Sequence, residues 1–206
     1  MPARRPPADS RAAPRARRAR GQRTRERLLA AGADVFADRG FHAARVDDIV
    51  KLAATSHGTF YLYFANKEEL FHALAEQIAA QLELIAAQLP PLTPDPAGLA
   101  ALTSWMEQFR AIYAGAGPII TAWTEAEIVV SDVGRLGTNV HTAFTRSLID
   151  RIRATSGTDL DPVVAAIALV AMIERTNYYV LTGQVSVGDN ELVNTLARVT
   201  HAAIFN

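Results

Sequence analysis

The spacing of apolar residues constrains the fold of this 206-residue chain more than any other feature of its sequence. From Arg23 to the carboxyl end, apolar side chains recur every three or four positions, and no useful stretch alternates apolar with polar residues. A period near 3.6 is that of a helix with one buried face, whereas a half-buried strand repeats every two residues. The sequence therefore predicts an all-α protein.

Capping residues and helix breakers divide this pattern into segments. Gly40 stands where a first helix would end, because glycine is favoured in the left-handed conformation past a helix terminus. Ser56 is a good N-cap for a third short helix, and Asn66 with Glu69 forms a capping box that starts a long one. Prolines between 90 and 96 end that long helix. Beyond them we expect helices over about 97–115, 118–131, 135–155, 161–182 and 189–205.

Composition excludes several classes of protein. The chain has no cysteine, so disulfides, thiolate metal sites and cysteine nucleophiles are ruled out. The longest unbroken apolar run, Val163 to Ile173, is far shorter than the ~20 residues that a membrane-spanning helix needs. No phosphate loop or nucleophile motif is present, and the histidines lack metal-ligand spacing. We therefore expect a cytoplasmic non-enzyme with no catalytic residue, no metal site and no cofactor.

Positive charge is concentrated at the amino terminus, although the formal net charge is zero. Ten arginines fall within the first 27 residues, against Asp9 and Glu26. No hydrophobic segment of a secretory signal follows, and four prolines disfavour the helix of a transit peptide. Residues 1–22 are therefore expected to form a flexible arginine-rich arm. It could be a solubilising tail, or an arm that binds a polyanion such as DNA.

Two short helices around a break at Ala54-Thr55, preceded by a longer helix, indicate a helix-turn-helix. Phe60 and Phe64 would anchor the second short helix from its inner face. The outward side chains would then be His57, Thr59, Tyr61, Leu62 and Tyr63. Hydroxyls and imidazole can contact phosphates or base edges, and leucine can contact a thymine methyl group. The alternative is that the two tyrosines pack against the protein itself.

Three blocks within residues 23–72 carry a specific pattern. They are RERLL through FADRGF at 25–41, VDDI at 46–49, and GTFYLYFANKEEL at 58–70. In these blocks the chain resembles the tetracycline-repressor (TetR) family of bacterial transcriptional regulators. The resemblance implies a three-helix DNA-binding head at 23–69 and a larger helical body at 70–206 for ligand binding and dimerisation. The rest of the chain matches only in having further helices of suitable length.

The function implied by this resemblance is that of a homodimeric regulator, by default a repressor. It would bind a palindromic operator and be released by a largely apolar small molecule, without a membrane partner. The alternative is an architectural DNA-binding protein that needs no ligand. By matching position, Lys67 would hold a phosphate at the start of the long helix, unless it is an ordinary exposed lysine. The full set of candidate DNA-binding residues is Arg45, Val46, Ser56, His57, Gly58, Thr59, Tyr61, Leu62, Tyr63 and Lys67.

The sequence departs from the family pattern at four positions. The family usually has threonine at Arg45, glycine at Ala54, arginine or lysine at His57, and often arginine at Leu62. The reading helix therefore carries no formal positive charge unless its histidine is protonated. We expect Arg45 and the arginine-rich arm to supply the missing attraction to phosphates. The loss of glycine at Ala54 bears on the tightness of the turn.

The segment 161–182 is apolar nearly all round its first half, so both of its sides must be covered. One side can face the core and the other a second subunit, and the last helix offers a matching apolar stripe. Pattern and resemblance together predict a homodimer through residues 161–205, the alternative being a monomer with a deeply buried helix. The candidate interface residues are Val163, Ile167, Val170, Leu192, Leu196 and Val199.

Aromatic and polar residues of the body are candidates for a ligand pocket. Aromatic residues at helical spacing form a core more often than a cavity, and both interpretations stay open. Arg175 could meet a ligand carboxylate, but pairing with Glu174, Glu127 or a partner subunit is the commoner outcome. The candidate ligand-binding residues are Trp105, Phe109, Tyr113, Trp123, Glu127, Phe144, Met172, Arg175 and Tyr179.

Overall fold

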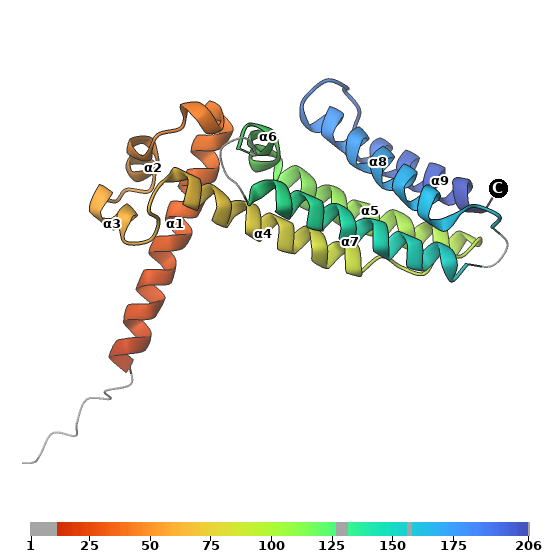
Figure 1. The fold of residues 1–206 in the computed structure, drawn as a ribbon, viewed down its shortest axis with the longest axis horizontal. Coiled ribbons are helices and arrows are strands. Elements are labelled where there is room, and N and C mark those ends of the chain that lie inside the picture. Colours follow the sequence, from red (N-terminus) through yellow and green to blue (C-terminus); the bar gives the residue numbers. More distant parts are fainter. Residues whose placement is uncertain (1–11, 127–131, 156–157, 206) are drawn as a thin grey trace, which may run out of the picture.

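A computed structural model describes residues 12–126, 132–155 and 158–205. Within these residues the regular secondary structure is entirely helical, which confirms the all-α prediction (Figure 1). The helices are α1 (Ala12–Ala43), α2 (Val46–Leu52), α3 (His57–Tyr61), α4 (Lys67–Ala87), α5 (Pro96–Gly115), α6 (Gly117–Ala126), α7 (Val133–Arg153), α8 (Pro162–Leu181) and α9 (Asp189–Phe205).

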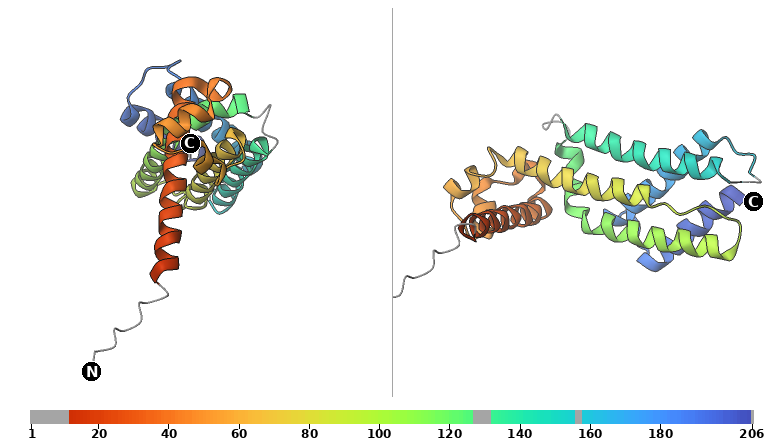
Figure 2. Two further views of the ribbon diagram at one scale, coloured as in Figure 1. Left: turned by 90° about the vertical axis from the view of Figure 1, so that its left-hand side faces the viewer. Right: turned by 90° about the horizontal axis from the view of Figure 1, so that it is seen from below.

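The helices form a head and a body that share α4. Helices α1 to α3 gather around the first half of α4, and this group is called the head. The second half of α4 runs away from the head beside α5 and α7, while α8 and α9 complete the body (Figures 1 and 2). Because α4 belongs to both parts, the expected boundary between residues 69 and 70 falls inside a continuous helix.

Local capping contacts set the helix ends as the sequence predicts. At Gly40, where a helix end is expected, φ is 72°, in the left-handed region that favours glycine; this breaks the helical conformation inside α1, which ends at Ala43. The Ser56 side chain accepts a hydrogen bond from the Thr59 amide, 3.1 Å away. The Asn66 side chain accepts one from the Glu69 amide at 2.8 Å, so the long helix begins at a true cap. These short-range contacts fix where α3 and α4 begin.

The prediction that residues 1–22 form a flexible arm is wrong for residues 12–22, because α1 begins at Ala12. Pro14 falls in the first turn of α1, where a missing backbone N–H costs nothing. The alanines and arginines that follow are good helix formers. The helix therefore projects beyond the head as a single rod (Figure 1). Residues 1–11 lie outside the described residues.

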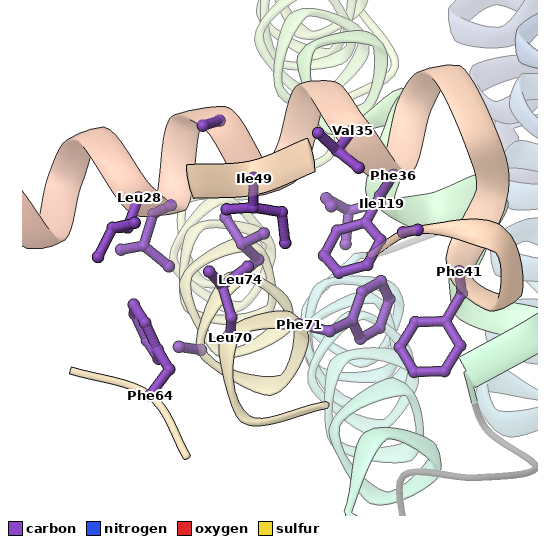
Figure 3. Packing of buried hydrophobic residues seen from close by; sticks show 14 of the residues in the cluster. Leu28, Val35, Phe36, Phe41, Ile49, Phe64, Leu70, Phe71, Leu74 and Ile119 are labelled. Atoms are coloured by element: carbon purple, nitrogen blue, oxygen red, sulfur yellow. The ribbon is translucent and has the colours of Figure 1, made fainter. Parts of the chain in front are cut away.

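The core of the head is a cluster of aromatic rings. Phe36, Phe41 and Phe71 contact one another, with ring centroids 5.0 to 5.8 Å apart (Figure 3). Phe60 and Phe64 are buried in the same cluster, as predicted for the anchors of the second short helix. Phe71 is a residue of α4, so the head packs directly onto the helix that continues into the body.

Helix α8 is the one described helix that is long and apolar enough to cross a membrane, judged by length and composition. It meets this test although its unbroken apolar run is short, because the apolar composition continues past Glu174 and Arg175. Only 22% of the most apolar 18-residue stretch of α8 is buried inside the chain. One side of α8 packs against α7, while Val163, Val164 and Ile167 remain exposed. This uncovered apolar surface is unusual for a helix that has no partner.

Candidate nucleic-acid interface and cavity

The turn between α2 and α3 is closed by backbone hydrogen bonds. The Thr55 amide donates to the Val50 carbonyl at 2.9 Å, and the Ala54 amide donates to the Lys51 carbonyl at 3.2 Å. Ala54 has φ 48° and is the one non-glycine residue with a positive φ in the described part of the chain. The turn is therefore tight, with alanine in a conformation that costs an L-residue roughly 1–2 kcal/mol.

Helix α3 presents a short, largely uncharged surface. Phe60 is fully buried beneath it, whereas 57% of Tyr61 and 81% of Leu62 are exposed. His57 and Gly58 are also exposed, and Thr59 is half-buried against Ser56. Leu62 is the most exposed large apolar side chain among the described residues. A leucine in this position gains from contact with another apolar surface.

Asp47 pairs with His57 across the helix-turn-helix. The His57 Nε2 lies 2.6 Å from the Asp47 Oδ1, joining the start of α3 to the first turn of α2. When the imidazole is protonated, this contact becomes an ion pair between two exposed side chains. The sequence pattern predicts His57 only as an outward group, and it gives no sign of this partner ten positions away.

The two tyrosines have different surroundings. Tyr61 points away from the head, as expected of a reading residue. Tyr63 is half-buried against the core of the head, and a Cβ placed on Gly21 would lie only 3.4 Å from the Tyr63 hydroxyl oxygen. Tyr63 thus packs between α3 and the projecting part of α1. For this residue the packing interpretation is the better one.

The expectation that Lys67 holds a phosphate is contradicted by its contacts. Its ammonium donates to the carbonyl oxygens of Phe41 at 2.8 Å, His42 at 3.0 Å and Ala44 at 3.1 Å. An ammonium has three N–H donors, so all of them are used. These carbonyls follow the break in helical conformation at Gly40 and lead from the last turn of α1 toward α2. Lys67 therefore stabilises the head from within.

Other positive charges of the head remain exposed. Arg45 stands at the N-cap of α2 with its side chain outside the cap. On α1, Arg20, Arg23 and Arg27 are exposed and follow one another at helical spacing on one face. Arg25 differs, because its guanidinium lies 5.4 Å from the centroid of the Phe64 ring. The exposed stripe of Arg20, Arg23 and Arg27 is hereafter called the α1 arginine stripe.

The body contains a cavity of about 570 Å³ between α4, α5, α7 and α8. Six of the predicted ligand-binding residues line it: Trp105, Phe109, Tyr113, Trp123, Phe144 and Arg175. Two do not, since Met172 packs half-buried on the core of the body and Tyr179 faces outward. Glu127 lies outside the described residues. The predicted aromatic residues that the structure describes therefore include several that both line the cavity and pack in the core of the body.

The polar lining of the cavity includes residues that were not predicted from the sequence. The Tyr113 hydroxyl donates to the Glu174 carboxylate at 3.3 Å, and burial, followed by the nearby carboxylate, raises the pKa of Tyr113 well above its usual range. The phenol therefore stays protonated. Tyr178 and Thr200 also line the cavity. Glu174 and Tyr178 follow Val170 on α8 by four and eight positions, a spacing that could have indicated a shared face.

Comparison with known proteins identifies the head. Residues 28–74 match the family model of bacterial regulatory proteins of the tetR family. Over these residues the chain is similar to the DNA-binding region of TetR-family regulators. This match covers α2, α3 and the parts of α1 and α4 that carry the aromatic core, the same region on which the resemblance in sequence rests.

The relatives in sequence are HTH-type transcriptional regulators, and the first of them are matched over only about a third of their length. The HTH-type transcriptional regulator YdgC of Bacillus subtilis is 39% identical over 72 residues, which span 35% of this chain and 37% of YdgC. EthR of Mycobacterium tuberculosis is 26% identical over 187 residues, which span 86% of this chain and 85% of EthR. A solved transcriptional regulator of Aquifex aeolicus has the same fold, with a TM-score of 0.68 at 17% identity over 87% of this chain and 99% of that one.

Two departures from the usual TetR pattern have visible consequences. Ala54 keeps the tight turn by adopting the left-handed conformation that the usual glycine would adopt without strain. Arg45 takes the N-cap position of α2 but makes no capping hydrogen bond. Asp47 and Asp48 in the first turn still provide negative charge near the positive end of the helix dipole. The turn is thus closed with alanine at this position, and α2 begins without a side-chain cap.

Proposed function

We propose that this protein is a cytoplasmic transcriptional regulator of the TetR family that binds an operator in double-stranded DNA as a homodimer and leaves it when a small molecule occupies the cavity. Repression is its default action. The observation that carries this proposal is the exposure of Leu62 and Tyr61 on a helix held by a closed turn. A side-chain surface of this kind suits the major groove, where a methyl group and hydrogen-bonding base edges are within reach.

Positive charge for the DNA backbone comes from outside α3 in this proposal. Lys67 is occupied by backbone carbonyls, and His57 is paired with Asp47. Arg45 and the α1 arginine stripe are exposed. Arg20 and Arg23 belong to the same segment of α1 as Gly21, the position that lies against the Tyr63 hydroxyl. Each arginine–phosphate contact would add affinity without adding sequence preference.

Dimerisation is proposed through the uncovered apolar surface of α8. Val163, Val164 and Ile167 are exposed there, and Val199 is exposed on α9. Three residues expected at the interface, Val170, Leu192 and Leu196, are instead buried in the core of the same chain. A side chain already buried in its own subunit has little area left to cover a partner. The proposed interface therefore keeps Val163, Ile167 and Val199 and adds Val164.

Selection of bound duplexes from a random DNA pool tests this function. The native chain is expected to select a palindrome whose half-site centres are about 34 Å apart, one helical turn of DNA. Leu62→Ala is expected to weaken binding to that palindrome by about tenfold, a loss of roughly 1–3 kcal/mol for a base contact. Leu84→Ala is the matched control, since Leu84 is an exposed leucine of α4 in the body.

Two results would contradict the proposal. One is the recovery of no preferred sequence. The other is a Leu62→Ala chain that selects the same palindrome with unchanged affinity.

An architectural protein without a ligand would bind DNA in the same way whatever compound is added. A compound that raises the melting temperature of the free protein and weakens its DNA binding therefore favours the regulator.

A further inference from the structure

We infer that the effector is elongated, that the part of it at the end of the cavity far from the head is uncharged, and that this part carries one oxygen that accepts a hydrogen bond from Thr200. This inference rests on the proposed function, in which the cavity is the effector site. It adds the chemical class of the ligand. The observations that carry it are the shape of the cavity, the pairing of its polar groups, and one unpaired hydroxyl.

The cavity is long in the direction of the helices. Its lining runs from Ile78 on α4 to Leu89, just past the end of that helix, and from Leu102 to Tyr113 on α5. The eleven residue steps from Leu102 to Tyr113, at 1.5 Å each, give a length of about 16 Å along α5. Because α4 and α5 run in opposite directions, Leu89 and Leu102 mark the end far from the head (Figure 1). Tyr113 marks the end near the head.

Three polar side chains toward the head-side end, those of Tyr113, Glu174 and Arg175, already have partners. The Tyr113 hydroxyl donates to Glu174, and the Glu174 carboxylate lies 3.9 Å from the Arg175 Nε. Arg175 also stacks on the ring of Tyr178, with 5.4 Å between guanidinium and centroid. Further along, the Trp105 indole N–H donates to the Ile85 carbonyl at 2.8 Å. A ligand atom at these groups would have to compete with bonds that exist.

Thr200 is different, because its hydroxyl has no partner among the described residues. Thr200 is 1% exposed. Among the described residues, its Oγ1 is the one buried side-chain nitrogen or oxygen atom without a hydrogen bond. Threonines within helices commonly donate to the carbonyl four residues earlier. Thr103, Thr142 and Thr182 do so, each at 2.8 to 2.9 Å. Thr200 does not, and it lines the cavity from α9.

The far end of the cavity offers nothing to a charged atom. Leu89, Leu102 and Leu148 line it beside Thr200, and the lining residues with ionisable acid, imidazole or guanidinium groups are Glu174, Arg175 and His141. Arg151 donates to the Leu89 carbonyl at this end but is not a lining residue. A charge buried there would lose its hydration without gaining a counter-ion. A ketone or ester oxygen fits, since it needs a single donor.

Tryptophan fluorescence can report binding directly, because both tryptophans of the chain, Trp105 and Trp123, line the cavity. The probes are 2-decanone, decane, decanoic acid and decylammonium, which share one chain length. The native protein is expected to bind 2-decanone most tightly, about threefold to tenfold better than decane, as one hydrogen bond implies. Thr200→Val, which keeps the shape and removes the hydroxyl, should abolish that difference. Thr200→Ser should retain it.

The inference is overturned if Thr200→Val binds 2-decanone as tightly as the native protein. It is also overturned if the acid or the ammonium binds most tightly, or if no probe changes the fluorescence. Urea unfolding of Thr200→Val provides the folding control, and it should show a protein at least as stable as the native chain. If 2-decanone binds as expected but does not weaken operator binding, the inference stands and the proposed function fails.

Discussion

The Lys67 ammonium donates a 2.8 Å hydrogen bond to the carbonyl oxygen of Phe41, and this bond ties the first residue of α4 to the last turn of α1. The same ammonium lies 4.9 Å from the centroid of the Phe41 ring, so the cation also contacts the aromatic core of the head. Because α4 continues into the body, any displacement of its first turn is passed on to α1. Lys67 is thus a link within the head, between α1 and the helix that continues into the body.

Replacing Lys67 should therefore affect stability more than DNA attraction. Lys67→Met keeps the apolar stem and removes three charged hydrogen bonds, and it is expected to lower the free energy of unfolding by about 2 kcal/mol in urea titrations. Lys51→Met, at the exposed lysine of α2, should change it by less than about 0.5 kcal/mol. A decrease of ~0.9 in the salt dependence of DNA binding, with stability unchanged, would instead assign Lys67 to a phosphate.

Ala54 is the position where a single substitution should stabilise the turn. Ala54→Gly removes the strain of φ 48°, and the free energy of unfolding should rise by about 1 kcal/mol. Ala30→Gly, at an exposed position inside α1, is the control and should lower it by a similar amount. Thermal unfolding of the native chain and the two variants measures whether each substitution raises or lowers the free energy of unfolding. Destabilisation by Ala54→Gly would show that the alanine is not strained.

The α1 arginine stripe should determine the salt dependence of DNA affinity. Changing Arg20, Arg23 and Arg27 together to Gln should reduce the slope of log affinity against log salt by about 0.9 for each phosphate that the variant no longer neutralises. The matched control changes three exposed arginines of the body, Arg146, Arg153 and Arg198. Fluorescence anisotropy over a range of salt concentrations gives both slopes. Equal slopes for the stripe variant and the native chain would refute contact between the stripe and DNA.

The exposed face of α8 should control the oligomeric state. The native chain is expected to show a light-scattering mass of twice 22.3 kDa at micromolar concentration. Ile167→Glu places a charge in the proposed interface, and its mass should fall to that of one chain because burying an unpaired carboxylate is costly. Leu84→Glu, at an exposed leucine of α4, should leave the dimer intact. A single-chain mass for the native protein would remove the proposed interface.

Much of the fold could be predicted from local signals. The 3.6-residue period indicates helices, and Ser56 and Asn66 mark two of their starts through contacts with residues three positions away, while the left-handed conformation of Gly40 marks the break inside α1. The block at 58–70 is also a local pattern, and it was sufficient to indicate the family. Such signals are reliable because their partners are close in the chain and do not depend on how the helices pack.

The positions that needed the folded chain all depend on distant partners. From the sequence alone, Lys67 is expected to be an exposed lysine at the start of a helix. In the folded chain, its ammonium contacts carbonyl oxygens of residues 23 to 26 positions earlier. Leu192 and Leu196 form an apolar stripe that could face either a partner or the core, and the packing of α9 on α5 buries them. Thr200 would be an ordinary helical threonine if α9 did not place it against the cavity. Periodicity tells which side chains leave the water, but which surface covers them is set by the arrangement of helices far apart in the sequence.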